Sequence, residues 1–367
     1  MPWNREKLDR VFDPRVVAVV GARRVDGYTW LRNMSDFTGK LYSVQIDPND
    51  VAGIDEMGIP NYKSLVEIPE PVDYVVVAVP RRAAPIVLKD AIAKGVKAVH
   101  MYTSGFVESD DEGAQLEQQI TQMAVEAGLV IVGPNCMGVF NPDVGMRFNP
   151  GQDVSNKGSV TIISQSGGLA STLIHGTQAS GIGINKGVSF GNGIVLDSPD
   201  LLEYFAADPK TTIICAYIEG TRNGRRFFQE LRKAASKKPV ILLKGGQTEA
   251  GQRMSASHTG SLATSKGVWD AMVRQSGAIG VDSFDDAVDM IKALSYMTPT
   301  TGNGVGIMGG SGGQSVTMSD DFARAGLRVP TLSQPTLEMM SNFFQLIGAS
   351  YFNPMDTAGG GLHKAHL

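Results

Sequence analysis

His258 stands in a setting that suits covalent chemistry. It lies in the run SASHTGS at positions 255–261, whose small polar side chains form no apolar face that a core could bury. A neutral imidazole, with a pKa of about 6.5, is a competent nucleophile near neutral pH. We therefore predict that His258 is a catalytic residue that carries a phosphoryl group.

A phosphorylated histidine needs a group on its other ring nitrogen that holds the tautomer and offsets the charge of the ring. Glu219 follows the apolar run 213–218 and precedes Gly220, so its carboxylate lies at the carboxyl end of a predicted strand. Open α/β sheets bind their ligands at that edge. Glu219 is therefore the predicted partner of His258, and the alternative is a solvated acid in a turn.

Three apolar strands rich in β-branched residues, which open at residues 16, 160 and 305, each lead into a glycine-containing loop and then a helix. The intervals between them are each about the length of one domain. Continuous apolar strands are typical of parallel sheets that are covered on both faces. The pattern predicts an α/β protein with a Rossmann-like domain over 1–153, a flavodoxin-like doubly wound domain over 154–299, and the start of a third flavodoxin-like domain, incomplete in this chain, over 300–367.

The second of these loops is a predicted phosphate site. Backbone N–H groups at a helix start face solvent at the positive end of the helix dipole, and they bind anions there. The predicted phosphate-binding residues are Ser164, Gln165, Ser166, Gly167 and Gly168.

The first loop begins at Gly21 and departs from the dinucleotide fingerprint G-x-G-x-x-G, because Arg23 occupies the place of the second glycine. Arg23 and Arg24 suit a ligand with more phosphate charge than NAD, since a guanidinium binds phosphate through two N–H donors. Asp47, at the end of the next strand, could still receive a ribose hydroxyl. An NAD-dependent dehydrogenase is therefore an alternative. The run GSLATSK at 260–266 fails the P-loop pattern, and we find no motif for a nucleoside triphosphate.

Composition excludes several other classes. Lysine and arginine number 33 against 37 acidic residues, a formal charge of -4 that offers no basic field to a nucleic acid. Two cysteines cannot form a disulfide framework, and the amino terminus lacks the apolar core of a signal peptide. No run approaches the roughly 20 apolar residues of a membrane span. We expect a cytoplasmic protein that binds neither nucleic acid nor membrane.

Four motifs in order resemble those of one enzyme family. They are GPNCMG at 133–138, SQSGG at 164–168, YIEG at 217–220 and SHTG at 257–260. The chain resembles the NDP-forming acyl-CoA synthetases, to which succinyl-CoA synthetase and the ADP-forming acid–CoA ligases belong. The resemblance implies an α-type portion of a ligase that makes acyl-CoA from a carboxylic acid, CoA and ATP, through an acyl phosphate and a phosphohistidine. It also implies an ATP-grasp portion, on a separate chain or downstream, that binds ATP, ADP and Mg; we expect no metal site on this chain and an oligomeric protein.

The resemblance implies CoA binding by the first domain, where four loops fall at carboxyl ends of predicted strands. The predicted CoA-binding residues are Gly21, Ala22, Arg23, Arg24, Val79, Pro80, Ser104, Gly105, Phe106, Asn135, Cys136 and Met137. The small carboxylic acid is expected near Ser166 and Asn192. One departure is the run Asp47-Pro48-Asn49, where the family commonly has Asn-Pro-Lys, so a lysine that could meet a CoA phosphate is missing.

A non-catalytic module that senses acyl-CoA is a further alternative. Such a module would keep the fold and lose the histidine. The presence of both His258 and Glu219 argues against it.

Overall fold

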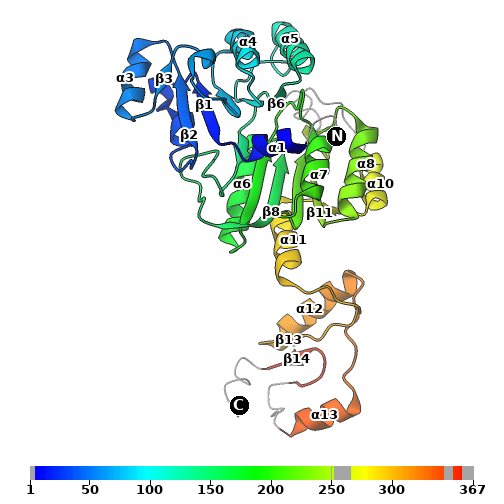
Figure 1. Cartoon of the computed structure of the whole chain (residues 1–367). Helices are drawn as coiled ribbons and strands as arrows, with labels where there is room; N and C mark the ends of the chain where they lie inside the picture. The colour runs from blue at the N-terminus through cyan, green and yellow to red at the C-terminus, as the bar shows by residue number, and fades with distance from the viewer. Residues whose placement is uncertain (1–4, 249, 252–265, 343–349, 358–367) are drawn as a thin grey trace. The chain divides into compact units, whose positions relative to one another are not determined.

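The computed structural model describes residues 5–248, 250–251, 266–342 and 350–357, and the chain divides into two compact units, 1–297 and 298–367 (Figure 1). The first unit contains two six-stranded sheets. Within the described ranges, no helix has both the length and the apolar character needed to cross a bilayer.

The first sheet is entirely parallel, in the order β3-β2-β1-β4-β5-β6. Its strands are β1 (Val16–Val20), β2 (Lys40–Val44), β3 (Asn61–Tyr62), β4 (Tyr74–Val77), β5 (Ala98–Met101) and β6 (Val130–Val132). The helices between them include α2 (Thr29–Arg32), α3 (Pro48–Glu56), α4 (Ala84–Lys94) and α5 (Asp111–Ala127). This is the strand order of the Rossmann fold, whose ligand crevice opens where the order reverses, between β1 and β4.

The second sheet has the order β12-β11-β10-β8-β9-β7. Its strands are β7 (Gly138–Phe140), β8 (Lys157–Ser164), β9 (Ile184–Ser189), β10 (Ile213–Ile218), β11 (Val240–Lys244) and β12 (Ile279–Val281). Its helices are α6 (Gly167–Ala179), α7 (Ser198–Ala207), α8 (Gly224–Ala235), α10 (Lys266–Ser276) and α11 (Phe284–Tyr296). From β8 onward the parallel strands follow the flavodoxin-like order, so the predicted fold class is confirmed.

One apolar core joins the two sheets of the first unit. Val19 of β1, Phe205 of α7 and Phe227 of α8 are fully buried members of the same cluster. β7, although it falls within the range 1–153, pairs antiparallel with β9 of the second sheet. The two sheets therefore form a single unit rather than two separate ones.

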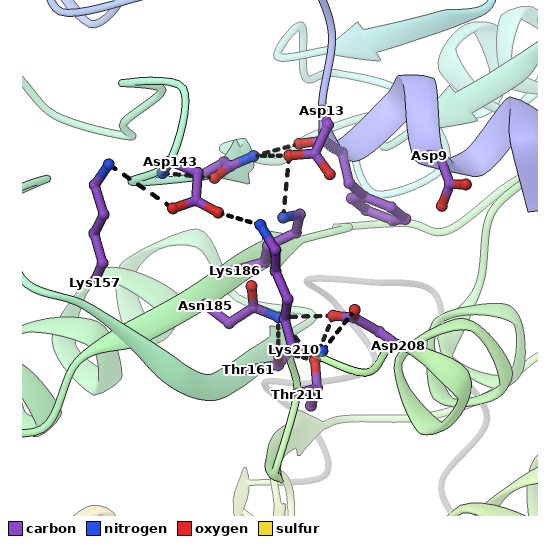
Figure 2. Close-up of polar contacts among 12 residues, drawn as sticks. Asp9, Asp13, Asp143, Lys157, Thr161, Asn185, Lys186, Asp208, Lys210 and Thr211 are labelled. Carbon is purple, nitrogen blue, oxygen red and sulfur yellow. Dashed lines mark hydrogen bonds and ion pairs between the residues drawn. The ribbon is translucent and has the colours of Figure 1, made fainter.

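The amino-terminal helix α1 (Arg5–Phe12) belongs to this shared core. The Phe12 ring packs 4.7 Å from the Tyr204 ring and 5.0 Å from the Phe205 ring of α7. Asp13 directly follows the helix and belongs to a polar cluster at the amino-terminal edge of the second sheet, shown in Figure 2. We call it the amino-edge cluster, and its members are Asp13, Asn141, Asp143, Lys186 and Lys210.

The second unit contains β13 (Met308–Gly309) and β14 (Met355–Asp356), which pair in parallel, with α12 (Gly312–Arg324) and α13 (Gln334–Ser341). Ser311 caps α12 through a hydrogen bond from the Gln314 N–H, as the third glycine-loop opening predicts. That this unit begins a further flavodoxin-like domain stays a prediction.

Candidate functional site

The adjacent strands β8 and β10 end side by side where the strand order of the second sheet reverses. Ser164 pairs with Tyr217, and the Gln165 N–H donates to the Tyr217 carbonyl at 3.1 Å. The Gln165 side chain then accepts hydrogen bonds from the N–H groups of Glu219, at 2.5 Å, and Gly220, at 2.9 Å. The structure therefore brings the predicted phosphate loop and the predicted histidine partner together.

The phosphate loop starts helix α6. Ser166 is the N-cap residue, and its Oγ accepts from the Leu169 N–H at 3.3 Å. Ser164 Oγ accepts from the Ser166 N–H at 3.1 Å and donates to the Ser166 carbonyl at 2.7 Å, which holds the turn. The N–H groups of Gly167 and Gly168 stand in the first turn, where a helix favours an anion.

A cavity of about 420 Å³ lies between this helix start and the loops of the first sheet. Eleven predicted site residues line it: Arg23, Val79, Pro80, Ser104, Asn135, Cys136, Met137, Gln165, Ser166, Gly167 and Gly168. Loops that follow six strands distant in sequence meet here. We call it the central cavity.

Several predicted site residues lie outside the lining of the central cavity. They are Gly21, Ala22, Arg24, Gly105, Phe106, Ser164, Asn192 and Glu219. The Phe106 side chain is fully buried in the core of the first sheet. Gly21 has a positive φ of 87°, and a Cβ there would lie 2.6 Å from Val79 Cγ1, so only glycine fits this turn. His258 lies outside the described residues.

The structure adds Ala78, Arg81, Tyr102, Thr103 and Gly191 to the lining, and the sequence prediction missed all five. Ala78, Tyr102 and Thr103 follow strands whose ends the sequence does locate, so they could have been found from the strand ends. The Arg81 guanidinium donates to the Gly105 carbonyl at 2.6 Å and pairs with Asp110 at 3.0 Å.

The two arginines of the central cavity differ in how far their guanidinium groups are already engaged by carboxylates of the protein. The hydrogen bond to Asp110, followed by the charge of that carboxylate and of Glu112, raises the pKa of Arg81. Arg23 has a looser ion pair, with Asp26 at 3.5 Å, and its side chain is about half exposed. Arg23 is therefore the guanidinium better placed to meet a phosphate.

Cys136 is not a nucleophile in this setting. Its side chain is 4% exposed, and burial raises the pKa of the thiol to about 12. A thiolate does the chemistry of cysteine, so the neutral Cys136 thiol acts as a packing group.

Glu219 is buried, with 7% of its surface exposed. Its Oε2 has no hydrogen-bond partner among the described residues. A buried carboxylate oxygen without a partner is costly, which indicates a site prepared for a donor.

Asn192 is held by acidic side chains. Its Nδ2 donates to Glu108 at 2.8 Å and to Glu117 at 2.9 Å. The Arg222 guanidinium pairs with Glu117 at 2.9 Å and donates to the Asn192 carbonyl. A role for Asn192 at the carboxylic acid stays a prediction.

A second cavity, of about 670 Å³, opens beside the first sheet and shares Val79 with the central cavity. Ile46 and Ile86 line it although they are 74% and 69% exposed. Lys63 and Lys89 also line it. Such an arrangement suits a flat apolar ring with an attached anion. We call it the apolar cavity.

Within the described parts of the chain, no group of three or more histidine, cysteine or acidic side chains could hold a metal ion. The Asp47 side chain, on which the dehydrogenase alternative depends, caps α3 by accepting from the Asn49 N–H at 2.9 Å.

Comparisons with known proteins agree with this geometry. Residues 15–142 match the family described as a CoA binding domain, and residues 157–294 match the succinyl-CoA ligase like flavodoxin domain. The chain is 37% identical over 353 residues to the α subunit of the ADP-forming acetate–CoA ligase II of Pyrococcus furiosus, covering 95% of this chain and 76% of that protein.

Another relative, the ADP-forming 4-hydroxybutyrate–CoA ligase of Nitrosopumilus maritimus, is 31% identical, with coverage of 88% of this chain and 47% of that protein. A solved structure, the dinucleotide forming acetyl-coenzyme A synthetase 1 of Ca. Korarchaeum cryptofilum with phosphate and ADP, is similar with a TM-score of 0.86 and 34% identity. The match covers 98% of this chain and 76% of the chain in that solved structure. The dehydrogenase alternative is therefore wrong, and the chain belongs to the family of ADP-forming acyl-CoA synthetases as an α-type portion.

Proposed function

We propose that this chain supplies the CoA site and the phosphohistidine site of an acid–CoA ligase that forms ADP. The observation that carries the proposal is the central cavity, where CoA-domain loops face the start of α6. Glu219, on the next strand end, holds a carboxylate oxygen without a partner in the described part of the chain. The reaction joins a small carboxylic acid to CoA in the cytoplasm.

CoA would lie along the carboxyl edge of the first sheet. Arg23 and the N–H groups of the loop after Gly21 would meet the pyrophosphate, and the thiol end would reach Asn135 and Met137 in the central cavity. The adenine would lie between Ile46 and Ile86 in the apolar cavity. Lys63 and Lys89 would then supply the positive charge that binds the 3′-phosphate. They would take the place of the lysine that the family commonly has at the position of Asn49.

The start of α6 would hold the phosphoryl oxygens, and His258 would exchange the phosphoryl group with the acid. Attack of a carboxylate oxygen on the phosphohistidine breaks the N–P bond and forms an acyl phosphate. Attack of the CoA thiol on its carbonyl carbon breaks the C–O bond and releases phosphate, which takes the thiol proton. Glu219 would accept a hydrogen bond from the second ring nitrogen and offset the charge of the phosphorylated ring.

The nucleotide would bind elsewhere. We place ATP, ADP and Mg on an ATP-grasp portion, which is either a separate subunit or a downstream segment, and we expect an oligomer. Relatives such as the Nitrosopumilus ligase are about twice as long as the part that this chain matches. The 367-residue chain alone should therefore not turn over ATP with acid and CoA.

The histidine is tested by His258→Asn in the presence of an ATP-grasp partner. The variant should lose the acid-labile, alkali-stable phosphoryl label and acyl-CoA synthesis, and should bind CoA as the parent does, because the predicted CoA loops all belong to the predicted domain 1–153, which does not include His258. Acyl-CoA synthesis at the parent rate would show that no phosphohistidine is involved.

The CoA site is tested by titration calorimetry with CoA, dephospho-CoA and NAD. We expect binding of CoA and none of NAD. Replacing Lys63 and Lys89 by alanine should weaken CoA roughly tenfold and leave dephospho-CoA unchanged, because only CoA carries the 3′-phosphate. Replacing the distant Lys292 is the matched control. Equal losses for both ligands would place the 3′-phosphate elsewhere.

A further inference from the structure

Asn192 joins loops around the central cavity that lie far apart in the sequence. We propose that Asn192 is a positioning residue, which holds two loops of the first sheet in place for the thiol end of CoA. These are the loop 102–108, which follows β5, and the loop 133–137, which follows β6. The inference rests on the proposed function and deepens it, because it assigns to Asn192 an effect on the binding of CoA.

The side chain of Asn192 contacts the loop that follows β5. Its Nδ2 donates to Glu108 Oε2 at 2.8 Å, and Glu108 Oε1 accepts from the Gly105 N–H at 2.8 Å. The Gly105 carbonyl in turn accepts from the Arg81 guanidinium at 2.6 Å. The Glu108 carboxylate therefore connects Asn192 to the turn beside Ser104, which lines the central cavity.

The backbone around Asn192 contacts the loop that follows β6. The Asn192 N–H donates to the Pro134 carbonyl at 3.0 Å. The Ile194 N–H donates to the Gly133 carbonyl at 3.2 Å. Gly191 has a φ of 52°, and a Cβ there would lie 2.2 Å from the Pro134 carbonyl oxygen. Only glycine allows the two segments to approach so closely.

The second sheet and α5 hold Asn192 from the other side. The Arg222 guanidinium, on the loop after β10, donates to the Asn192 carbonyl at 3.2 Å and pairs with Glu117 of α5 at 2.9 Å. Glu117 is buried and also accepts from Asn192 Nδ2 at 2.9 Å. Moving the amide would take one donor from a buried carboxylate, which is costly.

These contacts leave the Asn192 amide little with which to bind a carboxylic acid. Both hydrogens of Nδ2 are used, one on Glu108 and one on Glu117. Oδ1 is buried and has no partner among the described residues, but it is an acceptor, and an ionised acid has no donor for it. The two carboxylates would also repel an anion. Asn192 would therefore act on the cavity through the loops that it joins.

The test is titration calorimetry on the full chain with two ligands. One is CoA, and the other is adenosine 3′,5′-bisphosphate, which has the adenine and the 3′-phosphate of CoA but lacks the pantetheine arm. Asn192→Ala should bind CoA about tenfold more weakly, the size of a lost hydrogen bond to a charged group. It should bind the bisphosphate as the parent does, because the joined loops lie at the thiol end.

Glu108→Gln is a second variant that carries the test if Asn192→Ala does not fold. It places an amide against Asn192 Nδ2 and should also weaken the binding of CoA and not that of the bisphosphate. Because both variants break the same connection, the double variant should bind CoA no more weakly than the weaker single variant. Losses that multiply in the double variant would show that the two residues act independently, and would overturn the inference.

Asn141→Ala is the matched control. Asn141 is also fully buried, and its Nδ2 donates to the Phe12 carbonyl and to Asp13, both at 2.7 Å, in the amino-edge cluster. Its replacement should lower the free energy of unfolding and leave the affinity for CoA unchanged. An equal loss of CoA affinity in Asn141→Ala would mark the effect as a general structural one and overturn the inference.

The remaining outcomes separate the inference from the proposed function. If the parent chain binds no CoA, the proposed function fails and the role of Asn192 fails with it. If the parent binds CoA and both Asn192→Ala and Glu108→Gln keep its affinity, the positioning role is wrong and the proposed function stands. Equal losses for CoA and the bisphosphate would also overturn the positioning role. An unchanged CoA affinity with a raised KM for acetate, measured with an ATP-grasp partner, would make Asn192 a contact of the acid instead.

Discussion

His100 illustrates how burial decides what a titratable side chain does. It lies within β5 and is 1% exposed, its Nε2 lies 3.0 Å from the Cys136 carbonyl, and the Trp30 ring packs against it at 4.8 Å. Burial lowers the pKa of His100 to about 4, and the hydrogen bond opposes this shift. The imidazole is therefore neutral, donates to the Cys136 carbonyl, and holds the loop that lines the central cavity.

This shift predicts a pH dependence of stability. Between the unfolded pKa of about 6.5 and the folded pKa of about 4, only the unfolded chain binds the proton. The contribution of the neutral His100 to the free energy of unfolding should therefore be complete above pH 6.5. The free energy of unfolding should fall by about 3 kcal/mol as the pH drops to 4. His100→Gln, which keeps a donor, should flatten this decline in urea titrations, whereas a change at the exposed His175 should not. An unchanged decline in His100→Gln would contradict the assignment.

At the scale of elements, the amino-edge cluster attaches α1 to the second sheet. Lys186, on β9, is 3% exposed in its side chain, and its ammonium lies 3.2 Å from Asp13 (Figure 2). Lys210 pairs with Asp143 at 2.7 Å, and Asn141 donates to both Asp13 and the Phe12 carbonyl at 2.7 Å. These contacts tie the end of α1 to strands that are far from it in sequence.

Removing one partner of a buried ion pair lowers the free energy of unfolding strongly, because the other charge is left buried and unpaired. Replacing both partners by apolar side chains costs little. Asp13→Asn leaves the Lys186 ammonium without its nearest anion and should lower the free energy of unfolding by about 1–2 kcal/mol, a value reduced because Asp13 is 45% exposed. The double variant Asp13→Asn/Lys186→Met should be more stable than Asp13→Asn alone in urea unfolding. If the double variant loses as much free energy of unfolding as the two single variants together, Asp13 and Lys186 do not act as a coupled pair.

At the scale of the whole molecule, both cavities belong to one of the two compact units. All residues that line the central and apolar cavities fall between Val20 and Gly191, inside the unit 1–297. The core that joins the two sheets lies in the same unit.

A chain that ends at residue 297 should therefore fold and bind CoA. We expect its dissociation constant to match that of the 367-residue chain within about threefold, a difference under 1 kcal/mol. Titration calorimetry on both proteins makes the comparison, and thermal unfolding of the shorter chain checks its fold. A tenfold loss of CoA affinity in a folded 1–297 protein would show that the second unit takes part in the site.

The fold class could be predicted from the sequence because its signals are local. Runs such as 16–20 and 213–218 are apolar throughout, which is typical of strands buried on both faces, and the structure forms strands there. The rule that ligands bind at the carboxyl ends of parallel strands then placed Glu219 and the loop 164–168 at one edge. Their roles in phosphoryl transfer stay predictions.

Other features depend on contacts between residues far apart in the chain, which local patterns do not encode. Arg81 reaches the central cavity, and Asn192 binds Glu108 and Glu117, only because segments that are separate in the sequence meet in space. The antiparallel β7 and the core shared by both sheets have the same origin. Sequence periodicity therefore determined the strands and the sheet edge that holds the site, and tertiary packing decided which side chains face one another there, because side-chain direction depends on all the neighbours at once.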